Sequence, residues 1–340
     1  MGTGGQFTGA NRIVGVKEES VFGTYCAPTA DDYDIELYDA AALSFARNPV
    51  RLGKPAVGNL MQGRSKTGKI DMTGYSLKCA LKHSGDPTVT PKLDKFFRAA
   101  GLWPTRGEDN RIVYVYDGTQ PCQTLSIDVT EFNCGKNPDA ITRKGRGAVA
   151  NMVITGSGVG ELIDATFELS MAYEDEVDNP GAVKVLAAQD GGQPEKLLGV
   201  TFSINGKFYC LHSYTLNLNN EIAEVPDPSK PGGIYQHKVV GSDPTLTCSV
   251  QQLTLANSGL LELVRNDLDT DAERVVIKGR AFDIIIDLAN IRNQTTGDAA
   301  GINTDELEIE IRSLKIALKG EAGEEVEPEP DPEPEEGAEE

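Results

Sequence analysis

The chain has 340 residues, of which 39% are hydrophobic and 25% are charged, and its formal net charge is −20. This length allows one large domain or two ordinary domains with buried cores. The acidic excess argues against wrapping nucleic acid, which needs clustered Lys and Arg. The sequence has no apolar run long enough to span a membrane as a helix, and no signal-peptide pattern at its start. We therefore expect a soluble protein that is not secreted by the general route.

Both ends of the sequence differ from its body. Residues 1–20 begin with a glycine-rich stretch, for which we predict a flexible N-terminal arm. Residues 321–340 contain eleven acidic residues, four prolines and no Lys or Arg. Such a segment repels itself and has little apolar surface to bury, so we predict a disordered acidic tail.

The body has the pattern of short β-strands separated by Gly, Pro, Asn and Asp. Leu125, Ile127 and Val129 alternate with polar residues, which is typical of a strand with one buried face. The predicted strands are Ile70–Leu81, Ile112–Tyr116, Thr124–Phe132, Ala148–Thr155, Asp164–Tyr173, Gly199–Ile204, Phe208–Leu218, Pro244–Gln251, Phe282–Ile291 and Glu306–Ile311.

Two segments have the periodicity of an amphipathic helix. In Lys92–Gly101 the apolar residues fall on one stripe, and Gly101 can end the helix. In Ser258–Leu268 the leucines form the stripe, and Ser258 is a suitable N-cap. The predicted fold is therefore mainly β with one short helix per half.

The two halves of the body resemble each other. A shift of 169 residues places Leu77–Cys79 over Leu246–Cys248, and a shift of 159 places Leu125–Asp128 over Ile284–Asp287. Each half runs strand, long loop, strand, helix. We therefore predict a duplication, with a first domain over residues 21–175, a linker over 176–198 and a second domain over 199–320. The alternative is one β domain with an unrelated β module appended.

No motif predicts catalysis. The glycines of Gly156–Gly160 lack the GxxxxGK[ST] pattern of a phosphate loop, so we interpret them, like Gly145–Gly147, as a turn. His83, His212 and His237 have no second ligand at metal-site spacing. The six cysteines form no CxxC pair and are predicted to be reduced and mostly buried. We expect no enzyme activity and no cofactor or metal.

Corresponding loops of the two halves differ in charge. The loop over residues 47–69 contains six basic residues and no acidic one, whereas the loop over 217–240 opens with three acidic residues. Both loops could simply be solvated, and the basic loop could also contact DNA. The sharper interpretation is that the basic loop of one subunit meets an acidic surface of a neighbour. The candidate contact residues are Arg47, Arg51, Lys54, Arg64, Lys66, Lys69, Glu221, Glu224 and Asp227.

Several motifs, in this order, resemble the tail tube proteins of long-tailed bacteriophages. Residues 18–24, EESVFGT, are similar to the E-x-x-(aromatic)-G-T opening of that family. A glycine-bearing loop and strand, Gly63–Leu81, and a helix ending in Ala99–Leu102 follow. The pair Gly145–Thr155 and Gly160–Tyr173 is similar to the family's hairpin, although its terminal Gly is missing here.

The resemblance implies a β-sandwich or half-barrel with a flanking helix, whose inner strands join neighbouring subunits into a continuous β-barrel. Family rings contain six tube domains, so a duplicated chain would form trimeric rings and a single-domain chain hexameric ones. Stacked rings would build the tail tube of the virion, assembled in the host cytoplasm. Its partners would be further copies and the tape measure, terminator and tip proteins, with DNA passing through the lumen.

The alternative function is a β-sandwich binding or decoration module of a virion surface. The two functions differ in their self-association. Head-to-tail contacts of a tube protein generate an open filament, whereas a decoration module stays monomeric or forms a closed oligomer.

Overall fold

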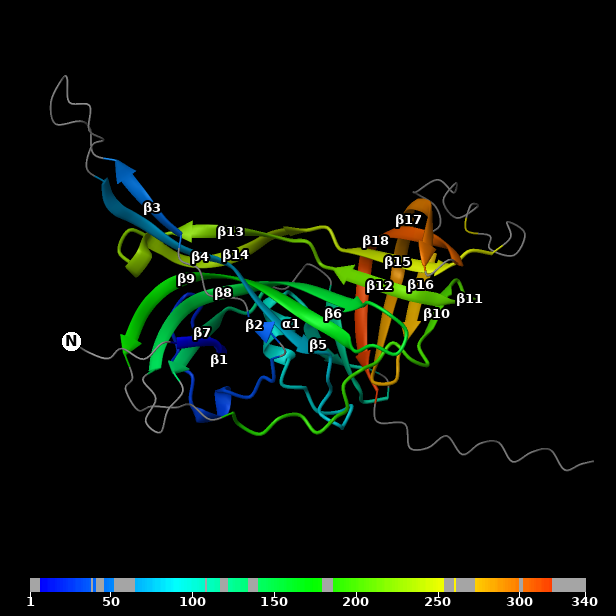
Figure 1. The fold of residues 1–340 in the computed structure, drawn as a ribbon, viewed down its shortest axis with the longest axis horizontal. Coiled ribbons are helices and arrows are strands. Elements are labelled where there is room, and N and C mark those ends of the chain that lie inside the picture. The colour runs from blue at the N-terminus through cyan, green and yellow to red at the C-terminus, as the bar shows by residue number, and fades with distance from the viewer. Residues whose placement is uncertain are drawn as a thin grey trace, which may run out of the picture.

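The computed structural model describes residues 7–37, 39–40, 46–51, 65–107, 109–116, 122–133, 140–178, 186–253, 260, 273–299 and 302–319. Within these ranges the protein is mainly β, as predicted (Figure 1). Sixteen strands form one antiparallel sheet, and β13 and β14 form a separate hairpin. Every segment predicted as a strand overlaps an observed one.

The first repeat comprises residues 7–178. Its strands are hydrogen-bonded in the order β1-β7-β8-β9-β4-β2, and β3 also pairs with β4. The hairpin of β5 and β6 is inserted between α1 and β7. The elements are β1 (Phe7–Glu18), β2 (Asp39–Ala40), β3 (Ala46–Arg51), β4 (Ser65–Ala80), α1 (Asp94–Ala99), β5 (Trp103–Arg106), β6 (Ile112–Tyr116), β7 (Leu125–Asn133), β8 (Ala140–Gly156) and β9 (Ile163–Asp178).

The second repeat comprises residues 201–318 and has the same strand order. Its strands follow β10-β16-β17-β18-β15-β12, so each strand has a counterpart at the same place in the first repeat. The elements are β10 (Thr201–Ile204), β11 (Lys207–Tyr209), β12 (Leu211–Asn217), β13 (Asn220–Pro226), β14 (Ile234–Ser242), β15 (Thr245–Gln251), β16 (Glu273–Lys278), β17 (Phe282–Ala299) and β18 (Ile302–Leu318). The two halves thus share one strand order, as the predicted duplication requires.

A shared irregularity supports the correspondence of the long hairpins. In the β8–β9 pair one of the two register shifts lies between Arg146 and Val149, and in the β17–β18 pair two of the three shifts lie on either side of Leu288. A bulge changes which face later residues occupy, so its position is a property of the individual hairpin. Its recurrence at corresponding places indicates that β8 and β9 are the counterparts of β17 and β18.

The strand order also corrects one part of the sequence alignment. Leu77 and Leu246 do occupy corresponding strands, β4 and β15, and both are buried. Leu125–Asp128, however, lies in β7, whereas Ile284–Asp287 lies in β17, the counterpart of β8. The shift of 159 residues was therefore wrong by one strand, because two consecutive buried strands have the same apolar alternation.

The core of the first repeat forms between α1 and the sheet. Phe96 stacks on Phe167 of β9 with ring centroids 4.8 Å apart, and Phe97 packs on Tyr114 of β6 at 4.7 Å. Gly101 has a φ of +94°, which ends the helix in the left-handed conformation that glycine adopts without strain. This confirms the predicted first helix. The second predicted helix, Ser258–Leu268, lies outside the described residues except for the buried Leu260.

The N-terminal segment is not a flexible arm over its described part. Residues 7–18 form β1, which pairs with β7 from Phe7–Asn133 to Glu18–Leu125. Val14 and Val16 are buried in the core. This strand could not be predicted from the sequence, because its start is rich in glycine and its apolar residues begin only at Ile13. Residues 1–6 and 321–340, the latter predicted to be a disordered tail, lie outside the described residues.

The prediction of a linker over residues 176–198 is also wrong in part. Residues 176–178 belong to β9, and 179–185 lie outside the described residues. Glu195 is buried and connects both repeats: its N–H donates to the Leu81 carbonyl at 2.9 Å, and its carboxylate accepts from the N–H groups of Arg280 and Ala281. This stretch packs as part of the fold.

Two arginines around Glu131 should make the attachment of β1 depend on pH. Arg12 of β1 donates to Glu131 Oε1 at 2.8 Å, and Arg143 of β8 donates to Oε2 at 2.5 Å. Burial alone raises the pKa of Glu131, but the arginine hydrogen bonds and charges outweigh it and hold the pKa below its ordinary value of 4.5. A depressed pKa stabilises the fold above that ordinary value, and the contribution is lost as pH falls through the folded-state pKa.

We therefore expect Glu131→Gln to lower the melting temperature at pH 7 and to have a smaller effect at pH 3, as measured by circular dichroism. Glu308→Gln is the matched control, because Glu308 is an exposed carboxylate of β18. It should change the melting temperature little at either pH. A loss of equal size at both pH values for Glu131→Gln would contradict the expected role of the carboxylate charge.

Candidate inter-subunit interface

The two repeats are joined edge to edge. β12 pairs with β15 of its own repeat and, along its other edge, with the end of β8 in the first repeat. The pairs run from Tyr214–Gly156 to Asn217–Val153. A second joint is made by β6, which pairs with β18. Backbone hydrogen bonds therefore continue from one repeat to the next, as they would between neighbouring subunits of a barrel.

A hairpin of the second repeat crosses the first repeat. We call this hairpin, residues 220–242, the second arm, because it belongs to the second repeat. It consists of β13, a 3₁₀ turn at Pro231–Gly233, and β14. It lies along β8 and β9 (Figure 1). At its base, the amide of Asn220 donates to the carbonyls of Ala100 at 2.9 Å and Ala150 at 3.0 Å. Farther along, the Tyr235 hydroxyl donates to the Phe22 carbonyl at 2.5 Å.

The EESVFGT motif forms the loop that this arm contacts. The carboxylate of Glu19 is buried and accepts four hydrogen bonds, from Gly23 N–H at 2.7 Å, Thr124 Oγ1 at 2.7 Å, Ser126 Oγ at 2.9 Å and Gly147 N–H at 2.7 Å. Gly23 has a φ of +71°, where a non-glycine residue would be strained. The motif thus fixes a tight loop and ties it to β7 and β8.

Gly145–Gly147 lies within β8 and not in a turn, which corrects the interpretation from the sequence. The Arg146 side chain is 2% exposed. Its guanidinium donates to the Tyr173 carbonyl at 2.8 Å and to the Ile234 carbonyl of the second arm at 2.7 Å, and it forms an ion pair with Glu174. A Cβ on Gly147 would lie 2.7 Å from Cα of Gln236, so glycine allows β14 to approach closely. By contrast, Gly156–Gly160 does form the β8–β9 turn, as predicted.

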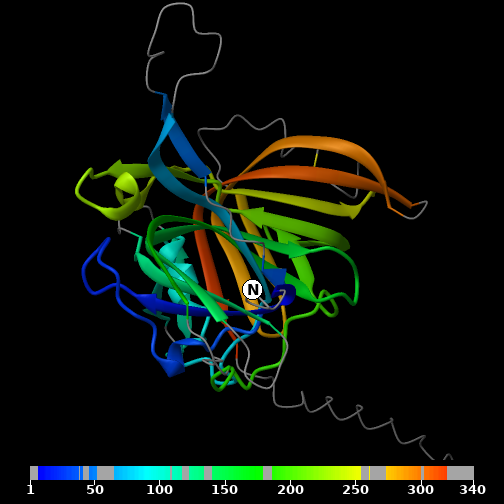
Figure 2. The same cartoon turned by 60° about the vertical axis from the view of Figure 1, so that its left-hand side comes forward.

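The predicted contact residues lie on two hairpins. We call residues 46–51 of β3 and 65–70 of β4 the first arm; it extends from the body in Figure 2. Arg47 and Arg51 belong to β3, Lys66 and Lys69 to β4, and Glu221 and Glu224 to β13. Asp227 follows β13, where its carboxylate accepts hydrogen bonds from Ser229 that hold its pKa below the ordinary range. Lys54 and Arg64 lie outside the described residues.

One pair of these residues is in contact within the chain. The Lys69 ammonium of the first arm forms an ion pair with the Glu224 carboxylate of the second arm. Both side chains are partly exposed, so the pair contributes little to stability. It brings the base of the basic first arm against the acidic second arm, whose turn and β14 also contact β4. No contact between subunits was required to bring these two residues together.

Most of the residues that hold the second arm could not be predicted from the sequence. Arg146, Tyr235 and Asn220 bond to partners far away along the chain, which single-sequence patterns do not reveal. Glu19 stands out in the sequence only as part of the EESVFGT motif. Gly147 carried the one usable signal, because a glycine inside a strand often marks a bulge or a close approach of another backbone.

Comparison with known proteins identifies no family for the chain. No protein-family model matches it, and neither does any curated protein. Among the described residues, no group of three or more His, Cys, Asp and Glu could hold a metal ion. None of the helices in the described ranges is long and apolar enough to cross a membrane.

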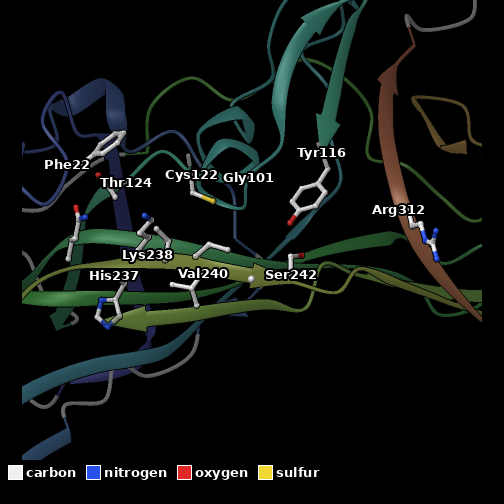
Figure 3. Close-up of a pocket in the computed structure, with 14 residues that line it drawn as sticks. Phe22, Gly101, Tyr116, Cys122, Thr124, His237, Lys238, Val240, Ser242 and Arg312 are labelled. Carbon is white, nitrogen blue, oxygen red and sulfur yellow. The ribbon is translucent and has the colours of Figure 1, made fainter. Parts of the chain in front are cut away.

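A pocket of about 460 Å³ lies between the second arm and the region of α1. Its lining includes Cys122, Tyr116 and His237 (Figure 3). Burial raises the pKa of the Cys122 thiol to about 11, so the thiol is protonated at neutral pH. Figure 3 shows the His237 ring turned away from Cys122. These two residues therefore do not form a cysteine–histidine nucleophile pair.

The other described cysteines vary in exposure. Cys79 and Cys248 are buried at corresponding positions of β4 and β15, and burial raises the pKa of each thiol to about 12. Cys26 is half-buried and Cys210 is exposed. All five described cysteines are free thiols, whereas Cys134 lies outside the described residues. The prediction of mostly buried thiols is correct for the strand cysteines and wrong for Cys210.

Proposed function

We propose that the protein is a tail tube subunit of a long-tailed bacteriophage, which joins further copies head to tail into rings that stack as a hollow tube. The observation that carries this proposal is the junction of β12 with β8. It extends one sheet across two repeats of the same fold. The chain therefore contains, between its own two repeats, the kind of edge-to-edge strand pairing that a ring of identical units needs between subunits.

The outer ends of the repeat pair support continued association. In the described part of the chain, β2 has β4 as its partner strand, and the outer half of β17 has β18. Open strand edges are binding or aggregation sites unless another strand covers them. Closing both edges on further copies would produce a ring, and three copies would supply the six tube domains implied by the family resemblance.

An exposed apolar patch supports a second kind of contact. Val159, Leu198 and Phe208 are all more than half exposed and line one shallow groove between the β8–β9 turn and the β10–β11 hairpin. Soluble monomers seldom expose clustered large apolar side chains unless they serve an interaction. Stacking of rings would require such a surface in addition to the edges that close each ring.

The decisive measurement is the state of the purified protein over a wide range of concentration. We expect sedimentation to show association and negative-stain microscopy to show tubes of uniform bore. Discrete closed particles at every concentration would contradict the tube function and support the decoration module. A persistent monomer would contradict the tube function as well.

A further inference from the structure

We propose that the outer half of β17 binds β2 of a second copy of this chain, in the register that the β8–β12 junction already displays between the repeats. This inference rests on the proposed self-association and specifies its interface. The occupant of the free edge of β17 is thus another copy, and each copy offers β2 to one neighbour and β17 to the other.

Equivalent residue pairs in the β8–β9 and β17–β18 hairpins show which residues of β17 correspond to the residues of β8 that bind β12. Phe167 of β9 pairs with Leu77 of β4, and Ile309 of β18 pairs with Leu246 of β15, the counterpart of Leu77. Phe167 and Ile309 are therefore equivalent. The residues that precede them, Thr166 and Glu308, pair with Val153 and Asn293. The four residues of β8 that bind β12, Val153–Gly156, thus correspond to Asn293–Thr296 of β17.

The position on β2 follows in the same way. Ala40 pairs with Leu77, and Leu216 pairs with Leu246, so Ala40 corresponds to Leu216 and Asp39 to Thr215. At the junction within the chain, Leu216 pairs with Ile154 and Thr215 with Thr155. Transferred to the interface between copies, this register places Ala40 opposite Gln294 and Asp39 opposite Thr295.

Both proposed edges are accessible in the described part of the single chain. The β17–β18 hairpin projects from the body, and its β17 edge beyond Ile291 has no strand beside it (Figure 2). β2 is the terminal strand of the long sheet, with β4 on one side alone. The two edges that remain open are thus the counterparts of the two edges that pair at the junction of the repeats.

An exposed leucine marks the same surface. Leu288 of β17 is 46% exposed, whereas its counterpart Val149 of β8 is 1% exposed. Val149 lines the pocket beneath the second arm. The first arm occupies the corresponding place in the first repeat, because it follows β2 along the chain and leads into the part of β4 that pairs with β9. Placed by the same junction, the first arm of the next copy would cover Leu288 as the second arm covers Val149.

The opposite charges of the arms fit this arrangement. Within the chain, the basic first arm contacts the second arm: Lys69 pairs with Glu224, and β4 lies against the turn and β14 of the second arm. Repeating the junction places the second arm of one copy beside the first arm of the next. Arms with Arg47, Arg51 and Lys66 would then alternate with arms carrying Glu221 and Glu224 around the ring. Alternating charge favours this order over pairing of identical arms.

Cysteine cross-linking tests the register. Directly opposed residues of an antiparallel pair have Cα atoms about 4.5–5.5 Å apart, within disulfide range. We expect the double variant Ala40→Cys/Gln294→Cys to give covalent oligomers on mild oxidation, seen on non-reducing gels. The register control is Ala40→Cys/Thr295→Cys, which moves the second cysteine by one residue and therefore to the other face of β17; it should cross-link far less. The single variants measure the background from native cysteines such as Cys210.

Sedimentation and microscopy of the same samples separate this inference from the proposed function. Assembled protein without a cross-link above background would overturn the edge pairing and leave the tube function standing. Cross-linked closed particles that never form tubes would support the edge pairing and overturn the tube function. Protein that stays monomeric at all concentrations would overturn both.

Discussion

Glu19→Gln should lower the free energy of unfolding by about 3 kcal/mol, because it replaces a buried acceptor of four hydrogen bonds with a group that both donates and accepts. The two hydroxyl donors can rotate to adapt. The backbone N–H groups of Gly23 and Gly147 cannot, and an amide nitrogen facing either one leaves a buried donor unpaired. Urea unfolding followed by fluorescence measures the loss.

Glu18→Gln is the matched control, because it makes the same change at the neighbouring residue. Glu18 forms an ion pair with Arg98 at a partly exposed position, so the variant should lose less than about 1 kcal/mol. Equal stability of Glu19→Gln and the wild-type protein would contradict the role assigned to the carboxylate. Loosening of the 19–24 loop should also weaken the contact of Phe22 with Tyr235, which hydrogen exchange of the second arm can detect.

The strands of the core could be predicted from the sequence because their alternation is local. Leu125, Ile127 and Val129 point into the core as the period of two requires. The buried residues Leu93, Phe96, Phe97 and Ala100 show the period of a helix. Segments whose pairing is supplied from elsewhere were missed. β1 begins among glycines, and its place depends on β7, more than a hundred residues away. β13 and β14 carry polar residues on much of both faces, because they form an arm over the surface.

The duplication was visible only where both copies keep a buried strand of similar composition, as at Leu77 and Leu246. Farther along, the sequence alignment pairs the wrong strands, because β7, β8, β16 and β17 all have the same apolar pattern. Hydrogen-bonding order distinguishes these strands, and that order is a property of the folded chain. The charge difference between the arms was readable in the sequence, but their neighbour relation was not, since Lys69 and Glu224 meet only through the fold.

Arg146→Met should release the tip of the second arm. Met retains much of the length and apolar character of the arginine stem, but it removes every donor to the carbonyls of Tyr173 and Ile234 and the ion pair with Glu174. Loss of a buried, hydrogen-bonded charge costs about 3 kcal/mol or more. Hydrogen exchange should show faster exchange across β14, and the melting temperature should fall. Unchanged protection of β14 would contradict this role for Arg146.

Arg143→Met provides the control on the same strand. Arg143 pairs with Glu131 and Glu176, away from the arm, so its removal should destabilise the β1–β7 side and leave exchange in β14 unchanged. The comparison also bears on assembly. If the second arm is the internal copy of a contact between subunits, a released arm should weaken the junction of the repeats. Arg146→Met should then assemble poorly even below its melting temperature, whereas Arg143→Met should assemble whenever it is folded.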